Sequence, residues 1–151
     1  MNRLLLLAIM ALSITTFAQN DTIKPWEVKG KISLNFTQSY FSNWSAGGDN
    51  SLNLVGRYTM DANYTKERHS WKNWVDLGFG YNVIGDNVPM KTEDKIEFVS
   101  AYQYSLKEHW SLTGILTFKS QFANGYDYSA DSTNNISGFM SPAYIDLGPG
   151  I

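Results

Sequence analysis

The chain contains no cysteine and only four prolines among its 151 residues. Without cysteine there is no disulfide, no thiolate metal site and no lipid-anchoring cysteine, so strand pairing and side-chain packing must hold the fold together. The formal net charge of −2 does not favour a nucleic-acid partner. Beyond residue 18, no stretch approaches the roughly 20 apolar residues that a membrane-spanning helix needs.

The first 18 residues have the features of a secretory signal peptide. Arg3 precedes an apolar stretch from Leu4 to Ile14, and small residues close to Ala18 mark a cleavage site. The stretch is too short to span a bilayer as a helix. We therefore expect residues 1–18 to be removed on export and residues 19–30 to form a periplasmic N-terminal segment.

What the chain does have is a repeated two-residue period. Aromatic residues make up 15% of the sequence and Gly, Ser, Asn and Thr are frequent, a mixture that favours strands and turns. In the first segment Ile32 and Leu34 share one face, while Lys31 and Ser33 share the other, as the pleat of a strand requires. Six segments follow this pattern, at residues 31–40, 51–64, 71–83, 95–106, 110–122 and 139–151.

These segments predict an all-β fold, an antiparallel up-and-down transmembrane β-barrel. At about 10 to 14 residues they exceed the usual strands of soluble sheets and suffice for a tilted membrane crossing. Long and short connections alternate, and aromatic residues gather near both ends, as in bacterial outer-membrane barrels. We therefore expect the protein in the outer membrane, with membrane lipid and the barrel-assembly machinery as its partners.

Two alternatives to this architecture stay open. A secreted soluble β-sandwich gives the same alternation, because one face packs on a core and the other meets water. Six strands also fall short of the eight with which single-chain outer-membrane barrels begin. We therefore interpret residues 31–151 as the N-terminal part of a truncated barrel domain, with closure by several copies as the alternative.

Charges occupy one face of the predicted wall, and short turns decide which of them meet, because a turn fixes strand register. One turn places Tyr64 opposite Trp71, and another places Leu106 opposite Trp110. These registers predict three charge pairs, Arg57 with Asp76, Asp61 with Lys72 and Glu97 with Lys119. With Lys95 added, the residues expected to face the lumen are Arg57, Asp61, Lys72, Asp76, Lys95, Glu97 and Lys119.

A polar face that neutralises its own charges predicts a narrow filled barrel or a weakly selective pore. The expected function is porin-like passive transport of a small solute. The alternative is a non-transporting surface module whose long loops bind glycan, protein or lipid through Trp44, Asp49, Tyr126 and Tyr128. No catalytic triad motif, phosphate loop or metal-ligand spacing is present, so we expect no enzyme activity, cofactor or metal ion.

Four groups of residues resemble one protein family. The most specific is the run SNWSAGGD at residues 42–49, and the others lie at residues 92–95, 118–126 and 139–144. Together they resemble the family catalogued as domain of unknown function 3078. The resemblance implies an exported, outer-membrane-barrel-like protein of Gram-negative bacteria, typically longer than this chain. It assigns no catalytic or binding residues.

Overall fold

A computed structural model describes residues 24–43, 47–128 and 134–151. Within these residues the chain forms eight strands and no helix. The strands are β1 (Trp26–Ser39), β2 (Ser51–Lys66), β3 (His69–Ile84), β4 (Met90–Lys107), β5 (Trp110–Ser120), β6 (Gly125–Tyr126), β7 (Asn135–Ser137) and β8 (Tyr144–Gly150). The predicted all-β class is confirmed.

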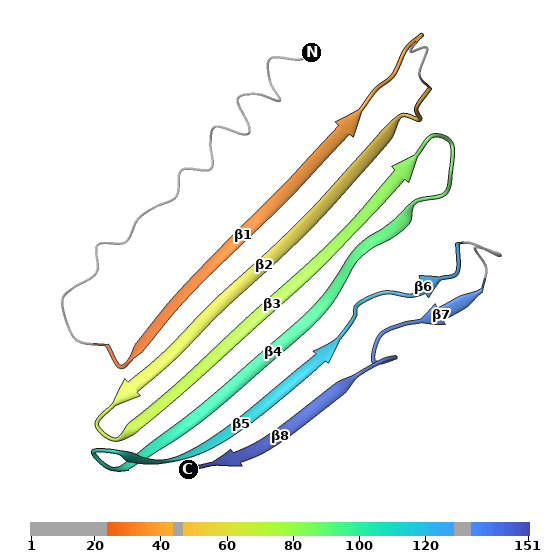
Figure 1. The fold of residues 1–151 in the computed structure, drawn as a ribbon. Coiled ribbons are helices and arrows are strands. Elements are labelled where there is room, and N and C mark those ends of the chain that lie inside the picture. The colour runs from red at the N-terminus through yellow and green to blue at the C-terminus, as the bar shows by residue number, and fades with distance from the viewer. Residues whose placement is uncertain (1–23, 44–46, 129–133) are drawn as a thin grey trace.

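Six strands form one antiparallel sheet in the order β1-β2-β3-β4-β5-β8 (Figure 1). The short strands β6 and β7 pair separately as a small hairpin between β5 and β8. Strands β1 and β8 are the two edges of the large sheet, so the described residues form an open sheet. No helix long and apolar enough to cross a membrane occurs in the part of the chain that the structure describes.

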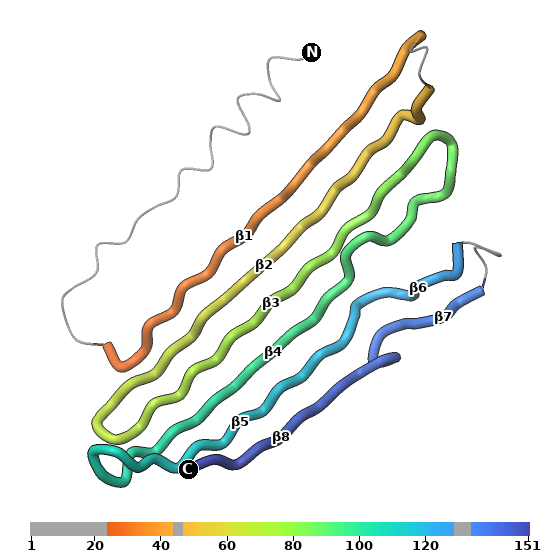
Figure 2. Tube along the Cα trace, in the orientation of Figure 1, coloured from red at the N-terminus to blue at the C-terminus, as the bar shows by residue number. Residues whose placement is uncertain are grey.

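The strands are long and lie side by side along most of their length (Figure 2). Strands β1 to β4 contain 14, 16, 16 and 18 residues, more than the five or six that are typical of soluble sheets. A two-residue turn at Glu67 and Arg68 joins β2 to β3. That tight turn fixes the register and sets Tyr64 opposite Trp71, as the sequence predicts.

The sheet has one apolar face and one charged face, because the side-chain period of a strand is two. On the apolar face, register aligns Ile32, Tyr58 and Leu77 across three strands. None of the described apolar residues is buried, and Ile32 is 81% exposed and Leu147 80% exposed. Within the described residues the sheet is therefore a single layer, and none of them covers its apolar face.

One predicted register is wrong at its turn. Leu106 does not lie opposite Trp110, because an irregularity between Ser105 and Lys107 brings Lys107 opposite Trp110 instead. Ser105 still lies opposite Ser111, so the remainder of the β4–β5 register agrees with the prediction.

The strand boundaries differ from the sequence segments by one or two residues at several ends, and by more at the places that follow. Strand β1 begins at Trp26, within the stretch predicted as a periplasmic segment, and β4 begins at Met90 rather than near Lys95. The last strand starts only at Tyr144, after Met140 with its positive φ of 61°. The β6–β7 hairpin lies in the stretch that the sequence suggested to be one long loop. The predicted signal peptide, residues 1–18, lies outside the described residues.

Candidate functional site

The charged face carries two adjacent rows of charges that together cross four strands. We call these rows the charge ladder and define it as Arg57 of β2, Asp76 of β3, Lys95 and Glu97 of β4 and Lys119 of β5. Register explains the arrangement, because Asp76 lies opposite Glu97 and Glu97 lies opposite Lys119. Arg57 and Lys95 occupy the neighbouring row, on either side of Gly78.

Asp76 is the centre of the ladder and its side chain is only 1% exposed. Its Oδ1 accepts a hydrogen bond of 2.8 Å from Arg57 Nε, and its Oδ2 accepts one of 2.5 Å from Arg57 Nη2. Lys95 Nζ donates to Oδ2 from the opposite side. The buried carboxylate therefore has two cationic partners, which a buried charge needs.

Glu97 continues the ladder towards β5. Lys119 Nζ lies 2.8 Å from Glu97 Oε1, and Lys95 Nζ lies 3.9 Å from Glu97 Oε2. The carboxylates are the covered members, since Glu97 is 19% exposed whereas the Arg57 and Lys119 side chains are 46% and 53% exposed. The ladder therefore presents mainly cationic groups to the space above the sheet.

Glu93 belongs to the same surface, although it is not among the residues that the sequence predicts to face the lumen. A Cβ atom added to Gly78 would lie 2.6 Å from Glu93 Oε1, so the Glu93 side chain covers the glycine between Arg57 and Lys95. The two-residue period places Glu93 in the connection before the fourth segment, which begins at Lys95. In the structure β4 begins at Met90, and Glu93 lies opposite Gly80 in the register that continues from Asp76 and Glu97.

The predicted partners Asp61 and Lys72 are on the charged face but are not joined. Asp61 lies opposite Trp74 and Lys72 opposite Asn63, which is the predicted diagonal placement. No ion pair connects Asp61 to Lys72 within the described residues, and Asp61 lies opposite Lys29 of β1 instead.

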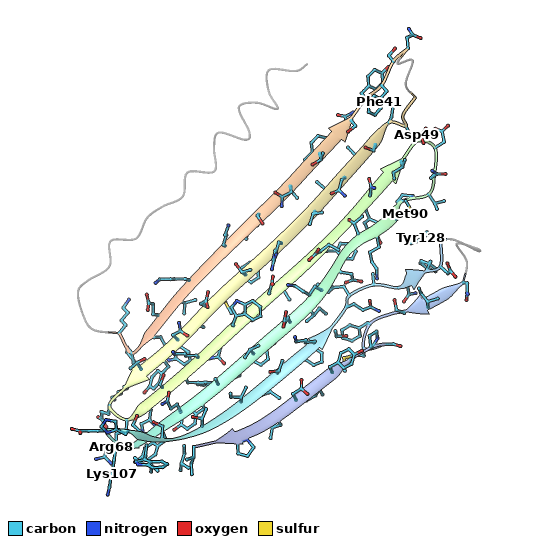
Figure 3. All side chains as sticks on the ribbon, in the orientation of Figure 1. Phe41, Asp49, Arg68, Met90, Lys107 and Tyr128 are labelled. Atoms are coloured by element: carbon cyan, nitrogen blue, oxygen red, sulfur yellow. The ribbon has the colours of Figure 1, made fainter. Side chains whose placement is uncertain are left out.

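The predicted loop contacts are separated from the ladder along the strands. Figure 3 shows Asp49 and Tyr128 at one end of the sheet and Arg68 and Lys107 at the other. The Tyr128 hydroxyl accepts a hydrogen bond of 3.3 Å from the Lys91 backbone amide, while Tyr126 pairs with Asn135 in the small hairpin. No hydrogen bond joins Asp49 to either tyrosine within the described residues, and Trp44 lies outside those residues.

An ion pair outside the charge ladder, unpredicted from sequence, holds the segment that follows β5. Lys91 Nζ lies 2.5 Å from Asp94 Oδ2 and also donates to the Ala123 carbonyl at 2.8 Å. Asp94 accepts hydrogen bonds from the backbone amides of Phe122 at 2.6 Å and Ala123 at 3.1 Å. We call Lys91 and Asp94, with these backbone partners, the β4 clasp. It is enclosed, since the two side chains are 11% and 4% exposed.

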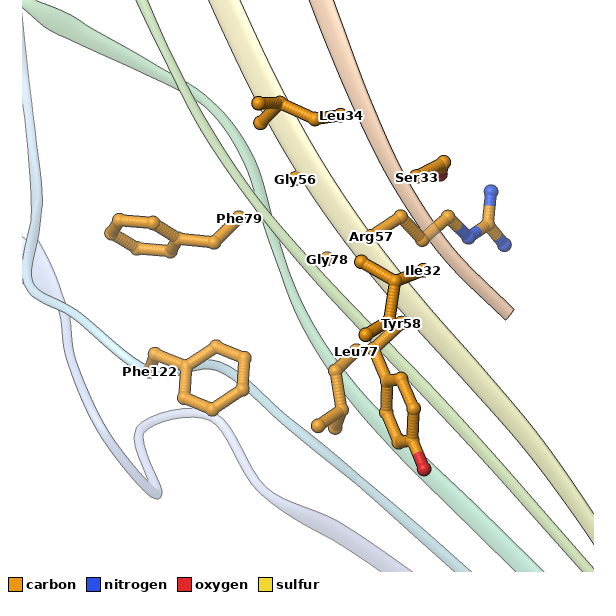
Figure 4. Close-up of a pocket in the computed structure, with 10 residues that line it drawn as sticks. All are labelled: Ile32, Ser33, Leu34, Gly56, Arg57, Tyr58, Leu77, Gly78, Phe79 and Phe122. Carbon is orange, nitrogen blue, oxygen red and sulfur yellow. The ribbon is translucent and has the colours of Figure 1, made fainter. Parts of the chain in front are cut away.

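The apolar face contains a groove of about 480 Å³. Figure 4 shows Leu34, Leu77 and Phe79 around it, while Arg57 extends away towards the charged face. Gly56 leaves a depression beside Leu34 because it has no side chain.

Aromatic residues cluster at the turn end of the apolar face. The Trp26 ring lies 5.2 Å from Tyr64 and 5.7 Å from Trp71, measured between centroids. Trp71 Nε1 donates a hydrogen bond of 2.8 Å to Ser100 Oγ. Trp71 thus combines an apolar ring with a hydrogen-bonded polar atom, as aromatic residues do where an apolar phase meets water. Within the described residues, no group of three or more His, Cys, Asp or Glu side chains could hold a metal ion.

The long antiparallel sheet and the charge ladder define a two-faced β protein with one face apolar and one charged. The chain belongs to the family "Protein of unknown function (DUF3078)", whose family model matches residues 36–126. The matched part includes the whole charge ladder and the β4 clasp. Neither a curated protein nor a solved structure matches the chain.

Proposed function

We propose that this chain forms part of the wall of an outer-membrane β-barrel through which small polar solutes pass passively. The observation that carries the proposal is the single-layer sheet, in which exposed apolar side chains cover one face and ion pairs cover the other. In this arrangement the apolar face contacts lipid and the charge ladder faces a water-filled lumen.

The apolar face supports a lipid environment. Its residues are exposed across the sheet, from Ile32 at 81% in β1 to Leu147 at 80% in β8. An uncovered apolar surface of this extent is rare on soluble monomers and marks a contact with lipid or another apolar partner. The Trp26, Tyr64 and Trp71 cluster suits one membrane boundary, and the groove beside Gly56 suits a lipid acyl chain.

The open edges impose one further requirement. Strands β1 and β8 each leave a row of backbone groups unpaired in the described sheet, and such groups cannot face lipid. We therefore propose that additional strands, from a longer chain or from further copies, close the wall. Closure also encloses the charged face and gives it access to water from both ends.

Spin labelling tests the membrane arrangement directly, because a chain without cysteine accepts single labels cleanly. The neighbouring residues Tyr58 and Thr59 point to opposite faces of β2. One spin label is attached to the Tyr58→Cys variant and one to the Thr59→Cys variant, and each labelled protein is reconstituted in vesicles. We expect the label at position 58 to collide mainly with lipid-soluble oxygen and the label at 59 with water-soluble nickel chelate.

The alternative architecture gives another outcome in the same experiment. In a soluble β-sandwich, a label at position 58 is packed in a core and collides with neither reagent. Conductance across a planar bilayer then tests transport itself. A correctly folded barrel that carries no current would contradict passive transport.

A further inference from the structure

The charged face holds a polar groove between β1 and β2, which adjoins the charge ladder at Arg57. Its volume is about 360 Å³ and its lining residues are Lys31, Ser33, Asn35, Arg57 and Thr59. Register forms the groove, because Lys31 lies opposite Thr59 and Ser33 lies opposite Arg57. All five side chains carry hydrogen-bond donors, and none is a carboxylate.

The two cations of the groove retain donors that the protein does not use. Lys31 forms no ion pair within the described residues. Arg57 gives Nε and Nη2 to Asp76, which holds its guanidinium plane in place, while Nη1 makes no hydrogen bond in the described part of the chain. A fixed guanidinium with a free edge loses less entropy when it binds a ligand.

From these observations we infer that the groove binds a small oxyanion, a carboxylate or a phosphate, between Lys31 and Arg57. Ser33, Asn35 and Thr59 supply neutral hydrogen bonds beside the charges. Its volume lies near the lower end of the range for small-molecule sites, which fits a ligand of few atoms. This inference deepens the proposed function, on which its transport aspect rests, because it makes the permeating solute anionic.

The neighbouring lysine provides a matched control. Lys29 is two residues from Lys31 on the same face of β1, but its Nζ lies 2.6 Å from Glu27 Oε1 and it does not line the groove. Neutralising Lys29 and neutralising Lys31 change the total charge equally. A long-range electrostatic effect therefore changes the dissociation constant equally in both variants. A binding site at Lys31 changes it only in the Lys31 variant.

The test is calorimetric titration of the full chain, folded in nonionic detergent at low ionic strength. The probes are succinate and inorganic pyrophosphate, with glycerol as an uncharged comparison. We expect the dissociation constant to rise about tenfold in Lys31→Gln, equivalent to one lost charged contact, and less than about twofold in Lys29→Gln. Lys31→Arg should retain most of the affinity, which also shows that a change at this position leaves the fold intact.

If only succinate binds, the groove prefers a carboxylate. If only pyrophosphate binds, it prefers a phosphate. Absence of binding by both anions, binding of glycerol with equal strength, or equal effects at Lys29 and Lys31 overturns the inference. Conductance separates it from the proposed function. Anion binding without current overturns transport alone, while current with unchanged affinity in Lys31→Gln overturns the anion site alone.

Discussion

Arg57 and Asp76 form a two-point contact between adjacent strands. Arg57 Nε lies 2.8 Å from Asp76 Oδ1, and Arg57 Nη2 lies 2.5 Å from Asp76 Oδ2. The contact is diagonal, since Arg57 is directly opposite Gly78 and Asp76 is directly opposite Thr59. A planar guanidinium matches a carboxylate in this way only when the two strands hold one register, so the pair also reports that register.

Removing the charge of Asp76 should destabilise the protein. The Asp76→Asn variant retains the size of the side chain but leaves Arg57 and Lys95 without their shared anion. We expect the free energy of unfolding to fall by about 2 kcal/mol, as for lost hydrogen bonds to a charged group. Urea unfolding followed by tryptophan fluorescence measures the change.

Asp61→Asn is the control for that substitution, because Asp61 has no hydrogen bond or ion pair within the described residues. It should alter the unfolding free energy by less than about 0.5 kcal/mol. Equal unfolding midpoints for the two variants would refute the central role of Asp76.

Gly80, which lies beside the β3–β4 bulge, should not tolerate a methyl group. A Cβ at Gly80 would lie 2.8 Å from Val55 Cγ2 and 2.9 Å from the Leu54 carbonyl oxygen, and the latter belongs to the backbone. Gly80→Ala should therefore lower the unfolding free energy by about 1 to 3 kcal/mol. Gly114→Ala is the comparison, since a Cβ there has nothing within 4 Å. If both alanine variants unfold at the same denaturant concentration, the close approach at Gly80 is incorrect.

The turn between β2 and β3 should gain stability from a glycine. Glu67 has a φ of +53°, a conformation that disfavours residues with a Cβ. Glu67→Gly should raise the unfolding free energy by about 1 kcal/mol, because glycine adopts this conformation without the steric cost. Arg68→Gly, at the other turn position, gains nothing of this kind. Thermal melting of the two variants distinguishes them, and a stabilised Arg68→Gly contradicts the explanation.

Breaking the β4 clasp should loosen the segment after β5 without unfolding the sheet. Asp94→Asn weakens the contacts to Lys91 and to the amides of Phe122 and Ala123. We expect faster amide exchange at residues 122 and 123 by about tenfold or more, as for the loss of one charge-assisted hydrogen bond. Hydrogen-exchange mass spectrometry measures this, with Asp86→Asn in the β3–β4 turn as control. Unchanged exchange in Asp94→Asn would mean that the clasp does not hold this segment.

The sequence was sufficient to predict features that depend on period and on tight turns. Alternation identified the two faces of the sheet, and the register from Tyr64 opposite Trp71 correctly placed Arg57 diagonal to Asp76. Glu97 opposite Lys119 was also predicted, although Leu106 opposite Trp110 was wrong. The irregularity lies next to the turn, so it shifts the turn residues and leaves the register beyond it unchanged.

The features that sequence reasoning missed lie where the two-residue period cannot be followed. Strand β4 extends back to Met90 and places Glu93 opposite Gly80 on the charged face, in the same register that pairs Asp76 with Glu97. The bulge lies beyond Glu93 and adds Thr92 to β4. It also brings Lys91 and Asp94 together at the end of β5. A bulge adds one residue to one strand, and the polar stretch at residues 91–95 shows no alternation that would reveal where the extra residue lies. The sequence places Lys31 on the polar face of its strand. It does not show that Lys31 lacks an ion pair within the described residues, because that depends on the distances to carboxylates on other strands.

The order of strands in the large sheet bears on how the wall is built. Except where the small hairpin intervenes, each strand pairs with its neighbours along the chain. No strand must insert between two that are already paired, so assembly can proceed by adding one hairpin after another to a growing edge. The β2–β3 and β4–β5 hairpins close short turns, which keeps their entropic cost low, whereas residues 121–143 separate β5 from β8. The β2–β3 hairpin, with its two-residue turn, is the natural starting unit, to which β1 and β4 can add on either side.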